Sequence, residues 1–345
     1  MKIVLTLCSA NYLAHAKTMA DSLVEHNPDY QVVIGLVDRV PTTLESSFWQ
    51  PHELIPVEDL SIAALPEMVQ NYDIVELNTA VKPFYMEFLY RRNKDVKAVL
   101  YIDPDIVVYS SLEPLLTKLQ SHDIIVTPHS CTYDNSQMNI YYEIGMLATG
   151  VYNLGFLATA RSDTTFKFLQ WWQKRLQDFC YLDPARGLFV DQLWVTLAPV
   201  YFPEIYVEKH LGYNMSYWNH FERQLSFRDG RYYVNSEYDL FFYHFSSYSP
   251  DHPDLVTKRS KSRPTTFAER PDLKPIYDDY RTRLLARGYA SVKVYKYALR
   301  QNPPKAKVTM KTATMQSARR VLRTLPGSLQ YSLKRLAEFT INTFK

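Results

Sequence analysis

Residues 100–108 have the sequence LYIDPDIVV, in which Asp103 and Asp105 stand two positions apart between apolar runs. The run that leads into them, residues 96–102, is typical of a buried strand, and ligands of open α/β sheets bind at the carboxyl ends of such strands. Two carboxylates this close repel each other unless a cation or a proton lies between them. We favour a divalent ion that prefers oxygen ligands, Mn²⁺ or Mg²⁺. The alternative is a solvated turn, because Asp and Pro are common turn residues.

The N-terminal part of the chain alternates between strand and helix patterns. Residues 2–7 form an apolar run, residues 11–26 place apolar side chains at helical spacing, and residues 31–37 form a second apolar run. This order predicts a parallel sheet with crossover helices. We also expect a helix over residues 79–90. The polar and aromatic residues 128–149 are expected to form a long loop of the kind that often covers a functional site.

The bulk composition is that of a globular protein. Of the 345 residues, 46% are hydrophobic and 22% are charged, which predicts one large α/β domain with additions, or two domains. The three cysteines, Cys8, Cys131 and Cys180, are widely spaced. This spacing argues against a disulfide framework or a structural zinc site and favours a reducing cytoplasm. Because no apolar run reaches about 18 residues, we expect no membrane-spanning helix.

Charge is distributed unevenly along the chain. The net charge is +3, whereas residues 293–345 hold 12 Lys and Arg against the single acid Glu338, which leaves −8 on the preceding residues. Residues 305–345 mix basic and apolar side chains, and a basic amphipathic helix can lie on an anionic membrane surface. A solvated helical tail that packs on the body or on a second subunit is the alternative. The acidic body argues against nucleic acid as a partner.

Six segments, in order, resemble the GT-A nucleotide-diphospho-sugar transferases, in particular glycosyltransferase family eight and its bacterial relatives. The segments are residues 5–12, 80–83, 103–105, 152–156, 191–192 and 244–248. The resemblance covers residues 1–260 and implies an α/β GT-A domain there, with a Rossmann-like mixed sheet flanked by helices. Residues 261–345 would then form a basic, mainly helical C-terminal extension.

The resemblance implies a nucleotide site at the first of these segments. Tyr12 would stack on the base of the donor, beside three polar residues near the ribose: Thr6, Ser9 and Asn11. A packing role for Tyr12 is the alternative. Lys82 would face the diphosphate, because a cation at a helix start gains nothing from the helix dipole; the alternative is a solvated lysine.

Further segments are implied to border the sugars. Asn153 and Gly155 lie in an apolar strand, where a glycine often marks the close approach of a backbone or ligand. Asp191 and Gln192 correspond to a pair that contacts the donor or acceptor sugar, although Asp191 could also be a helix N-cap.

The resemblance also implies a third metal ligand, His244, next to Asp103 and Asp105. A histidine on so apolar a strand is otherwise a satisfied core residue. The family pattern is broken here, because Ser247 stands where a glycine is usual and a following lysine is missing. Lys258 is the candidate to replace that lysine at the phosphate.

The activity implied by the resemblance is metal-dependent transfer of a sugar, with retention, from a nucleotide-diphosphate donor to a glycan or lipid-linked acceptor. A UDP-sugar is the favoured donor, and Lys82, Asp191 and Gln192 are the catalytic candidates. Synthesis of bacterial surface polysaccharide or lipopolysaccharide on the cytoplasmic face of the membrane is the expected role.

Two other classes of protein remain open. One is a haloacid-dehalogenase-type phosphatase, whose nucleophile motif is also Asp-x-Asp after an apolar strand. That class needs a late acidic pair, and the candidate here is Asp278 with Asp279. The other is a non-catalytic carbohydrate-binding protein that uses the same aromatic surfaces.

Overall fold

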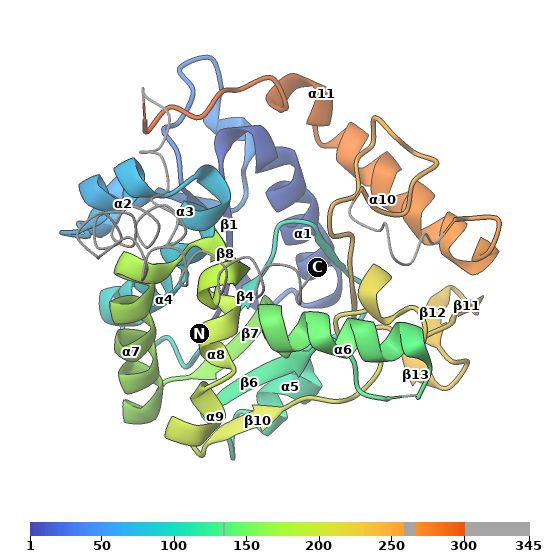
Figure 1. The fold of residues 1–345 in the computed structure, drawn as a ribbon. Coiled ribbons are helices and arrows are strands. Elements are labelled where there is room, and N and C mark those ends of the chain that lie inside the picture. Colours follow the sequence, from blue (N-terminus) through green and yellow to red (C-terminus); the bar gives the residue numbers. More distant parts are fainter. Residues whose placement is uncertain (134, 259–265, 301–345) are drawn as a thin grey trace, which may run out of the picture. The chain divides into compact units, whose positions relative to one another are not determined.

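The computed structural model describes residues 1–133, 135–258 and 266–300 and contains a mixed seven-stranded sheet (Figure 1). Its strands lie in the order β10 (Ile205–Val207), β6 (Ile124–Pro128), β7 (Tyr152–Ala160), β4 (Ala98–Ile102), β1 (Lys2–Cys8), β2 (Tyr30–Leu36) and β3 (Glu53–Pro56). Strand β7 is antiparallel to both of its neighbours, β4 and β6, and the other neighbours are parallel. The expected α/β fold with a mixed sheet is confirmed.

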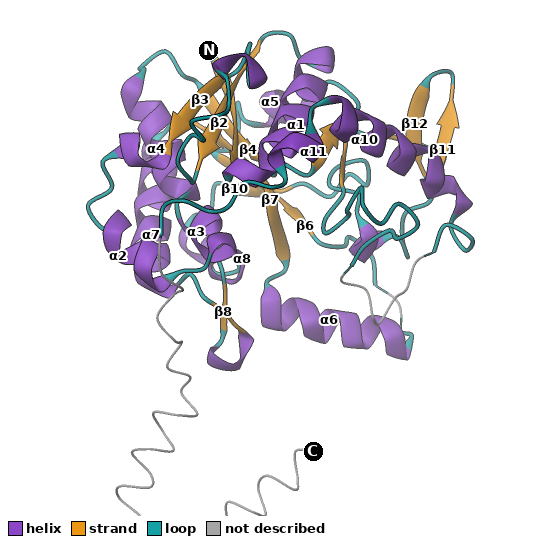
Figure 2. Cartoon of the chain, turned by 90° about the horizontal axis from the view of Figure 1, so that it is seen from above, coloured by secondary structure: helices purple, strands orange, loops and turns teal. Residues whose placement is uncertain are grey.

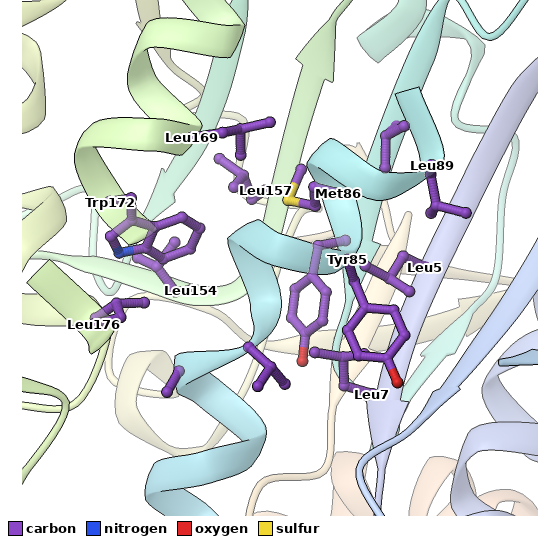
Figure 3. Close-up of a cluster of buried hydrophobic side chains, with 14 of the residues drawn as sticks. Leu5, Leu7, Tyr85, Met86, Leu89, Leu154, Leu157, Leu169, Trp172 and Leu176 are labelled. Atoms are coloured by element: carbon purple, nitrogen blue, oxygen red, sulfur yellow. The ribbon is translucent and has the colours of Figure 1, made fainter. Parts of the chain in front are cut away.

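Helices cover both faces of this sheet (Figure 2). The α-helices of the described residues are α1 (Leu13–His26), α2 (Leu65–Asn71), α3 (Ile74–Ala80), α4 (Lys82–Arg92), α5 (Glu113–Lys118), α6 (Gln137–Thr149), α7 (Asp163–Phe179), α8 (Gln192–Val195), α9 (Ala198–Tyr201), α10 (Lys274–Ala286) and α11 (Tyr289–Val292). On one face, Leu5 and Leu7 of β1 pack with Tyr85 of α4 and Trp172 of α7 (Figure 3). On the other face, Val4 packs in a cluster with residues of α1 and α5. The alternation of buried side chains along β1 follows from the two-residue period of a strand.

Three small sheets complete the described strands. They are β11 (Leu225–Arg228) with β12 (Arg231–Val234) and β13 (Tyr238–Asp239), β5 (Ile106–Val108) with β14 (Phe242–His244), and β8 (Leu182–Asp183) with β9 (Leu188–Phe189). The pairing of β5 with β14 is antiparallel and sets His244 opposite Ile106. It therefore brings the segment that holds His244 to the turn that follows β4.

Two expectations about local structure need correction. Residues 128–149 are not one long loop, because α6 occupies Gln137–Thr149, with the side chain of Ser136 accepting a hydrogen bond from the backbone N–H of Asn139 at its start. The helix expected over residues 79–90 is divided at Val81, since α3 ends at Ala80 and α4 begins at Lys82. Pro83 fits the first turn of α4 because its missing N–H would have no partner inside the helix.

The chain after residue 265 contributes to the core as far as it is described. Leu273, Ile276, Tyr277 and Tyr280 are buried with Tyr243 of β14 in one apolar cluster. The division expected at residue 260 stays a prediction. The basic tail expected over residues 305–345 lies outside the described residues. Within the described residues, no helix combines the length and the apolar character needed to cross a membrane.

Asp21 links three separate parts of the chain. Its carboxylate on α1 contacts His52 at 2.8 Å, just before β3, and Arg287 at 2.5 Å, at the end of α10. Burial acts to raise the pKa of Asp21, but the hydrogen bonds from His52 and Arg287 outweigh it, and the pKa is lowered from 3.8 to about 2.

We therefore expect Asp21→Asn to lower the free energy of unfolding at pH 7 by about 2 kcal/mol. Because the folded-state pKa lies below the unfolded one, this difference should persist above about pH 4 and shrink as the pH falls toward 2. Urea unfolding at several pH values measures it. The exposed carboxylate Asp29 provides the control variant Asp29→Asn, which should change stability by less than about 0.5 kcal/mol. Equal effects of the two substitutions would contradict the role of Asp21.

Candidate active site

The turn between β4 and β5 presents Asp103 and Asp105 at the carboxyl end of a central strand. The backbone N–H of Asp103 donates to the carbonyl of Gly155 on β7 (2.8 Å), and the carbonyl of Asp105 accepts from the N–H of Phe245, just after β14 (2.8 Å). The turn is thus held on one side by the main sheet and on the other by the β5–β14 pair. This double attachment fixes the backbone that carries both carboxylates.

His244 completes a group of three potential metal ligands. One ligand atom from each of Asp103, Asp105 and His244 lies within 4.8 Å of the other two. The Nε2 atom of His244 is 3.0 Å from a carboxylate oxygen of Asp105 and 3.7 Å from one of Asp103. Two oxygens and one imidazole nitrogen form a donor set that suits Mn²⁺ and related divalent ions.

The two carboxylates differ in their electrostatic surroundings. Burial raises the pKa of Asp103, and the neighbouring positive charge of Lys82 only partly opposes this. Burial acts in the same direction on Asp105, but the charge of His244 and its hydrogen bond lower the pKa overall. A cation between the two carboxylates would compensate their negative charges, which lie close together in a buried site.

Gly155 allows the close approach of His244. A Cβ atom at Gly155 would lie 2.5 Å from Cε1 and 2.8 Å from Nδ1 of the His244 ring, and 2.8 Å from the side-chain oxygen of Asn153. Real Cβ atoms do not come this close to other heavy atoms, so the ring could not keep its position beside any other residue. The glycine that the sequence marked as a point of close approach thus lies against a candidate metal ligand.

Lys82 and Asp191 form a buried ion pair beside the carboxylates. The Nζ atom of Lys82 is 2.6 Å from the Asp191 carboxylate and donates to the carbonyl of Leu154 at 2.8 Å. The exposed fractions of the two residues are 1% and 2%. Burial raises the pKa of Asp191, and Lys82 opposes the shift. Asp191 occupies the N-cap position of α8, but its side chain makes no capping hydrogen bond there.

Tyr101 connects this ion pair to the metal-ligand group. Its hydroxyl donates to the Oδ1 atom of Asp103 at 2.5 Å, and its ring centroid lies 4.1 Å from the Nζ atom of Lys82. A cation over an aromatic face is attracted by the negative face of the ring. Sequence reasoning missed Tyr101, because its position on an apolar strand predicts only a core residue.

Asn153 belongs to a buried network of amides. Its side-chain oxygen accepts from the N–H of Gly155 (3.1 Å) and from Asn214 (3.0 Å), which also donates to the hydroxyl of Thr127 (2.9 Å). Its side-chain nitrogen lies 3.3 Å from Nε2 of His129. Burial lowers the pKa of His129 to about 4, so this ring is neutral at pH 7. The sequence carried no signal for His129.

The expected nucleotide turn lies next to the candidate ligands in the sheet. Because β1 pairs with β4, with Leu5 opposite Tyr101, both strands end at the same edge. After β1, the hydroxyl of Ser9 donates to the side chain of Asn11 (2.7 Å), and Tyr12 is 37% exposed and stacks on His15. The buried hydroxyl of Thr6 has no hydrogen-bond partner among the described residues.

The last two candidates lie in different surroundings. Gln192 donates to the carbonyl of Thr149 (2.9 Å) and lines a cavity of about 570 Å³. Lys258 is exposed, and the contact described for it is a backbone hydrogen bond to Ser247 (3.2 Å). The cavity is lined by His129, Met138, Tyr141, Tyr142, Gly145, Met146, Thr149, Asn153, Phe189, Gln192, Tyr217, Trp218 and Ser246. Its volume suits a small organic ligand.

No model of a known protein family matches the chain. The chain is similar to the uncharacterized protein YfnF of Bacillus subtilis (strain 168), at 26% identity over 250 residues, which cover 70% of this chain and 80% of YfnF.

Two solved structures are also similar. The galactosyltransferase LgtC in complex with donor and acceptor sugar analogs is 16% identical, with 82% of this chain and 95% of that chain covered and a TM-score of 0.45. The glycosyltransferase GlyE of Streptococcus pneumoniae TIGR4 is 15% identical, with 87% of this chain and 65% of the GlyE chain covered and a TM-score of 0.46. Both of these similar proteins are glycosyltransferases.

Gly155→Ala should displace the His244 ring and weaken Mn²⁺ binding by at least about tenfold, in line with the cost of disturbing a ligand's support. Calorimetric titration with MnCl₂ measures the affinity. Gly145→Ala is the matched control, since a Cβ atom there meets nothing within 4 Å, and its affinity should be that of the wild type. Unchanged Mn²⁺ binding by Gly155→Ala would contradict His244 as a ligand.

Lys82→Met should lower the free energy of unfolding by about 3 kcal/mol, because it leaves the carboxylate of Asp191 buried without its partner. Urea unfolding at pH 7 measures the change. The double variant Lys82→Met with Asp191→Leu removes both charges and should be less destabilised than the two single variants predict by addition. Strict additivity would show that the two residues do not act as a pair.

Proposed function

We propose that this protein is a metal-dependent glycosyltransferase that moves a sugar from a nucleotide-diphosphate donor to an acceptor hydroxyl. The observation that carries the proposal is the group formed by Asp103, Asp105 and His244 at the end of β4, beside the turn that follows β1. The carboxyl ends of adjacent strands are where open α/β sheets bind nucleotides. A ligand group of this composition at such an edge suits a diphosphate and its cation.

The residues fit a divalent cation because they offer two carboxylate oxygens and one imidazole nitrogen within 4.8 Å of one another. When bound, such a cation neutralises the negative charge of a leaving diphosphate. The chain keeps the ligands in place: Tyr101 holds one oxygen of Asp103, and the contact with Gly155 positions the His244 ring.

We assign supporting roles to Lys82, Asp191 and Gln192. Burial raises the pKa of both Asp103 and Asp191, and the positive charge of Lys82 opposes this rise at each of them. Asp191 is then a fixed negative charge that would lie near the anomeric carbon of the donor. Gln192, which lines the cavity, would lie on the acceptor side.

Finer features of the proposal follow the family resemblance. The donor would be a UDP-sugar, with Tyr12 at the base and Asn153 at the sugar, and transfer would retain the anomeric configuration. The acceptor would be a glycan or glycolipid in bacterial surface-polysaccharide or lipopolysaccharide synthesis, reached from the cytoplasmic face of the membrane. Nuclear magnetic resonance of the product's anomeric proton tests the stereochemistry.

The phosphatase alternative is less well supported by the geometry. Its late acidic pair would have to reach the Asp103 turn, but both candidates lie on α10. Asp278 pairs with Lys274, and Asp279 contacts Arg283 at 3.0 Å and the hydroxyl of Tyr109 at 3.3 Å. Activity on a nucleotide sugar, as opposed to a phosphomonoester, separates the two classes.

A screen of nucleotide sugars for Mn²⁺-dependent hydrolysis identifies the donor, and the variants Asp103→Asn and Asp105→Asn then test the site. Each should reduce turnover by at least about 100-fold, because each removes a charged ligand. Asp29→Asn serves as a control for a charge change away from the site and should keep wild-type turnover. Near-normal turnover in both site variants would rule out the proposed role of the metal-ligand group.

A further inference from the structure

Helix α6 exposes more apolar surface than the fold requires. Asn139 is its buried residue, whereas Met138, Tyr141, Ile144 and Leu147 are 48%, 64%, 55% and 75% exposed. Figure 2 shows α6 beyond the start of β7 and apart from α4 and α7, which lie over one face of the sheet. Clustered apolar side chains on a protein surface commonly mark a binding site.

The apolar surface of α6 is continuous from the cavity to the outside. The helix residues that line the cavity recur at helical spacing: Met138, Tyr141, Tyr142, Gly145, Met146 and Thr149. Ile140, Ile144 and Leu147 recur at the same spacing on the adjoining strip, and Tyr141 lies between the two strips. Glu143 is the one acidic residue of the helix, which has no Lys or Arg.

The cavity also has polar lining residues, and it lies next to the metal-ligand group. His129, Asn153, Gln192 and Ser246 contribute polar groups there. The ring of Trp218, which also lines the cavity, meets the His244 ring edge to face at 5.1 Å. The indole N–H of Trp218 has no hydrogen-bond partner within the described part of the chain. A ligand in the cavity would thus meet polar groups near the reactive site and apolar ones along α6.

Both ends of α6 are attached to the body. Before the helix, the carboxylate of Glu222 accepts from the backbone N–H groups of Cys131 (2.9 Å) and Thr132 (2.7 Å). At its end, the carbonyl of Thr149 accepts from the side chain of Gln192 (2.9 Å), and a Cβ atom at the next residue, Gly150, would lie 3.0 Å from that side chain. These attachments hold the helix in place although its side chains bury little against the core.

We propose that α6 binds the apolar aglycone of the acceptor, so that the acceptor class is a sugar carrying an alkyl or aryl group. This inference rests on the proposed glycosyltransferase function. The sugar would lie near Asn153 and Gln192, and the aglycone would leave along Tyr141, Ile144 and Leu147. A bilayer is a poorer occupant of this surface, because helices that lie on anionic membranes carry Lys and Arg on their polar face.

The test compares acceptors that differ only in the aglycone. The probes are n-octyl glycosides, kept below their critical micelle concentration, and methyl glycosides of the common hexoses. For a hexose that the wild type accepts, kcat/KM should be at least about tenfold higher for the octyl glycoside than for the methyl glycoside. The double variant Ile144→Ser with Leu147→Ser should lose most of this preference through a higher KM for the octyl glycoside. Val200→Ser removes an equally exposed apolar side chain, 77% exposed on α9, and should keep the preference.

A direct binding measurement separates this inference from the proposed function. Octyl glycosides should raise the melting temperature of the wild type and of Val200→Ser, and much less that of the double variant. Donor hydrolysis with equal use of octyl and methyl glycosides would overturn the aglycone site and leave the proposed function standing. Octyl binding through α6 without activity on any nucleotide sugar would support the site and overturn the proposed function. If the double variant instead keeps the octyl preference and loses binding to anionic vesicles, the surface serves a membrane and the inference is wrong.

Discussion

Two carboxylates enclosed at the end of a buried strand create a negative charge that the surrounding residues must balance. Asp103 and Asp105 cannot move apart, because their backbone is held by β7 on one side and by the segment after β14 on the other. Burial alone would favour protonation of both. Three side chains oppose this effect. His244 contacts Asp105, the hydroxyl of Tyr101 donates to Asp103, and the positive charge of Lys82 acts on Asp103.

Two pairs of side chains balance the negative charge of the carboxylates. His244 lies next to Asp105, whereas Lys82 pairs with Asp191, and its charge also acts on Asp103. A buried ion pair is a weak source of stability, since desolvation offsets much of the attraction. Its role here is positional: the contact with Lys82 fixes the side chain of Asp191 near the metal-ligand group.

Much of this site could be predicted from the sequence, but the pairings could not. The motif around Asp103, the first strand and helix, and the glycine at residue 155 follow local patterns. By contrast, the partner of Lys82 is Asp191, 109 positions away, and no periodicity connects them. Helix α6 was wrongly expected to be a loop, because polar, aromatic and glycine residues hide its 3.6-residue repeat. The helix also lacks the usual separation into an apolar and a polar face, since apolar side chains occupy both its cavity side and its exposed side.

The reversed direction of one strand explains how the site and α6 are connected. In a purely parallel sheet, the polar residues at the start of a strand lie at the edge opposite the carboxyl ends of its neighbours. Because β7 runs antiparallel to β4, with Phe156 opposite Ile102, its first residues lie beside the end of β4. Asn153 and Gly155 therefore reach the metal-ligand group, and α6, which directly precedes β7, ends at the same edge. One antiparallel strand thus brings the carboxylates and the cavity wall together, so that a ligand held by α6 would be next to the reactive site.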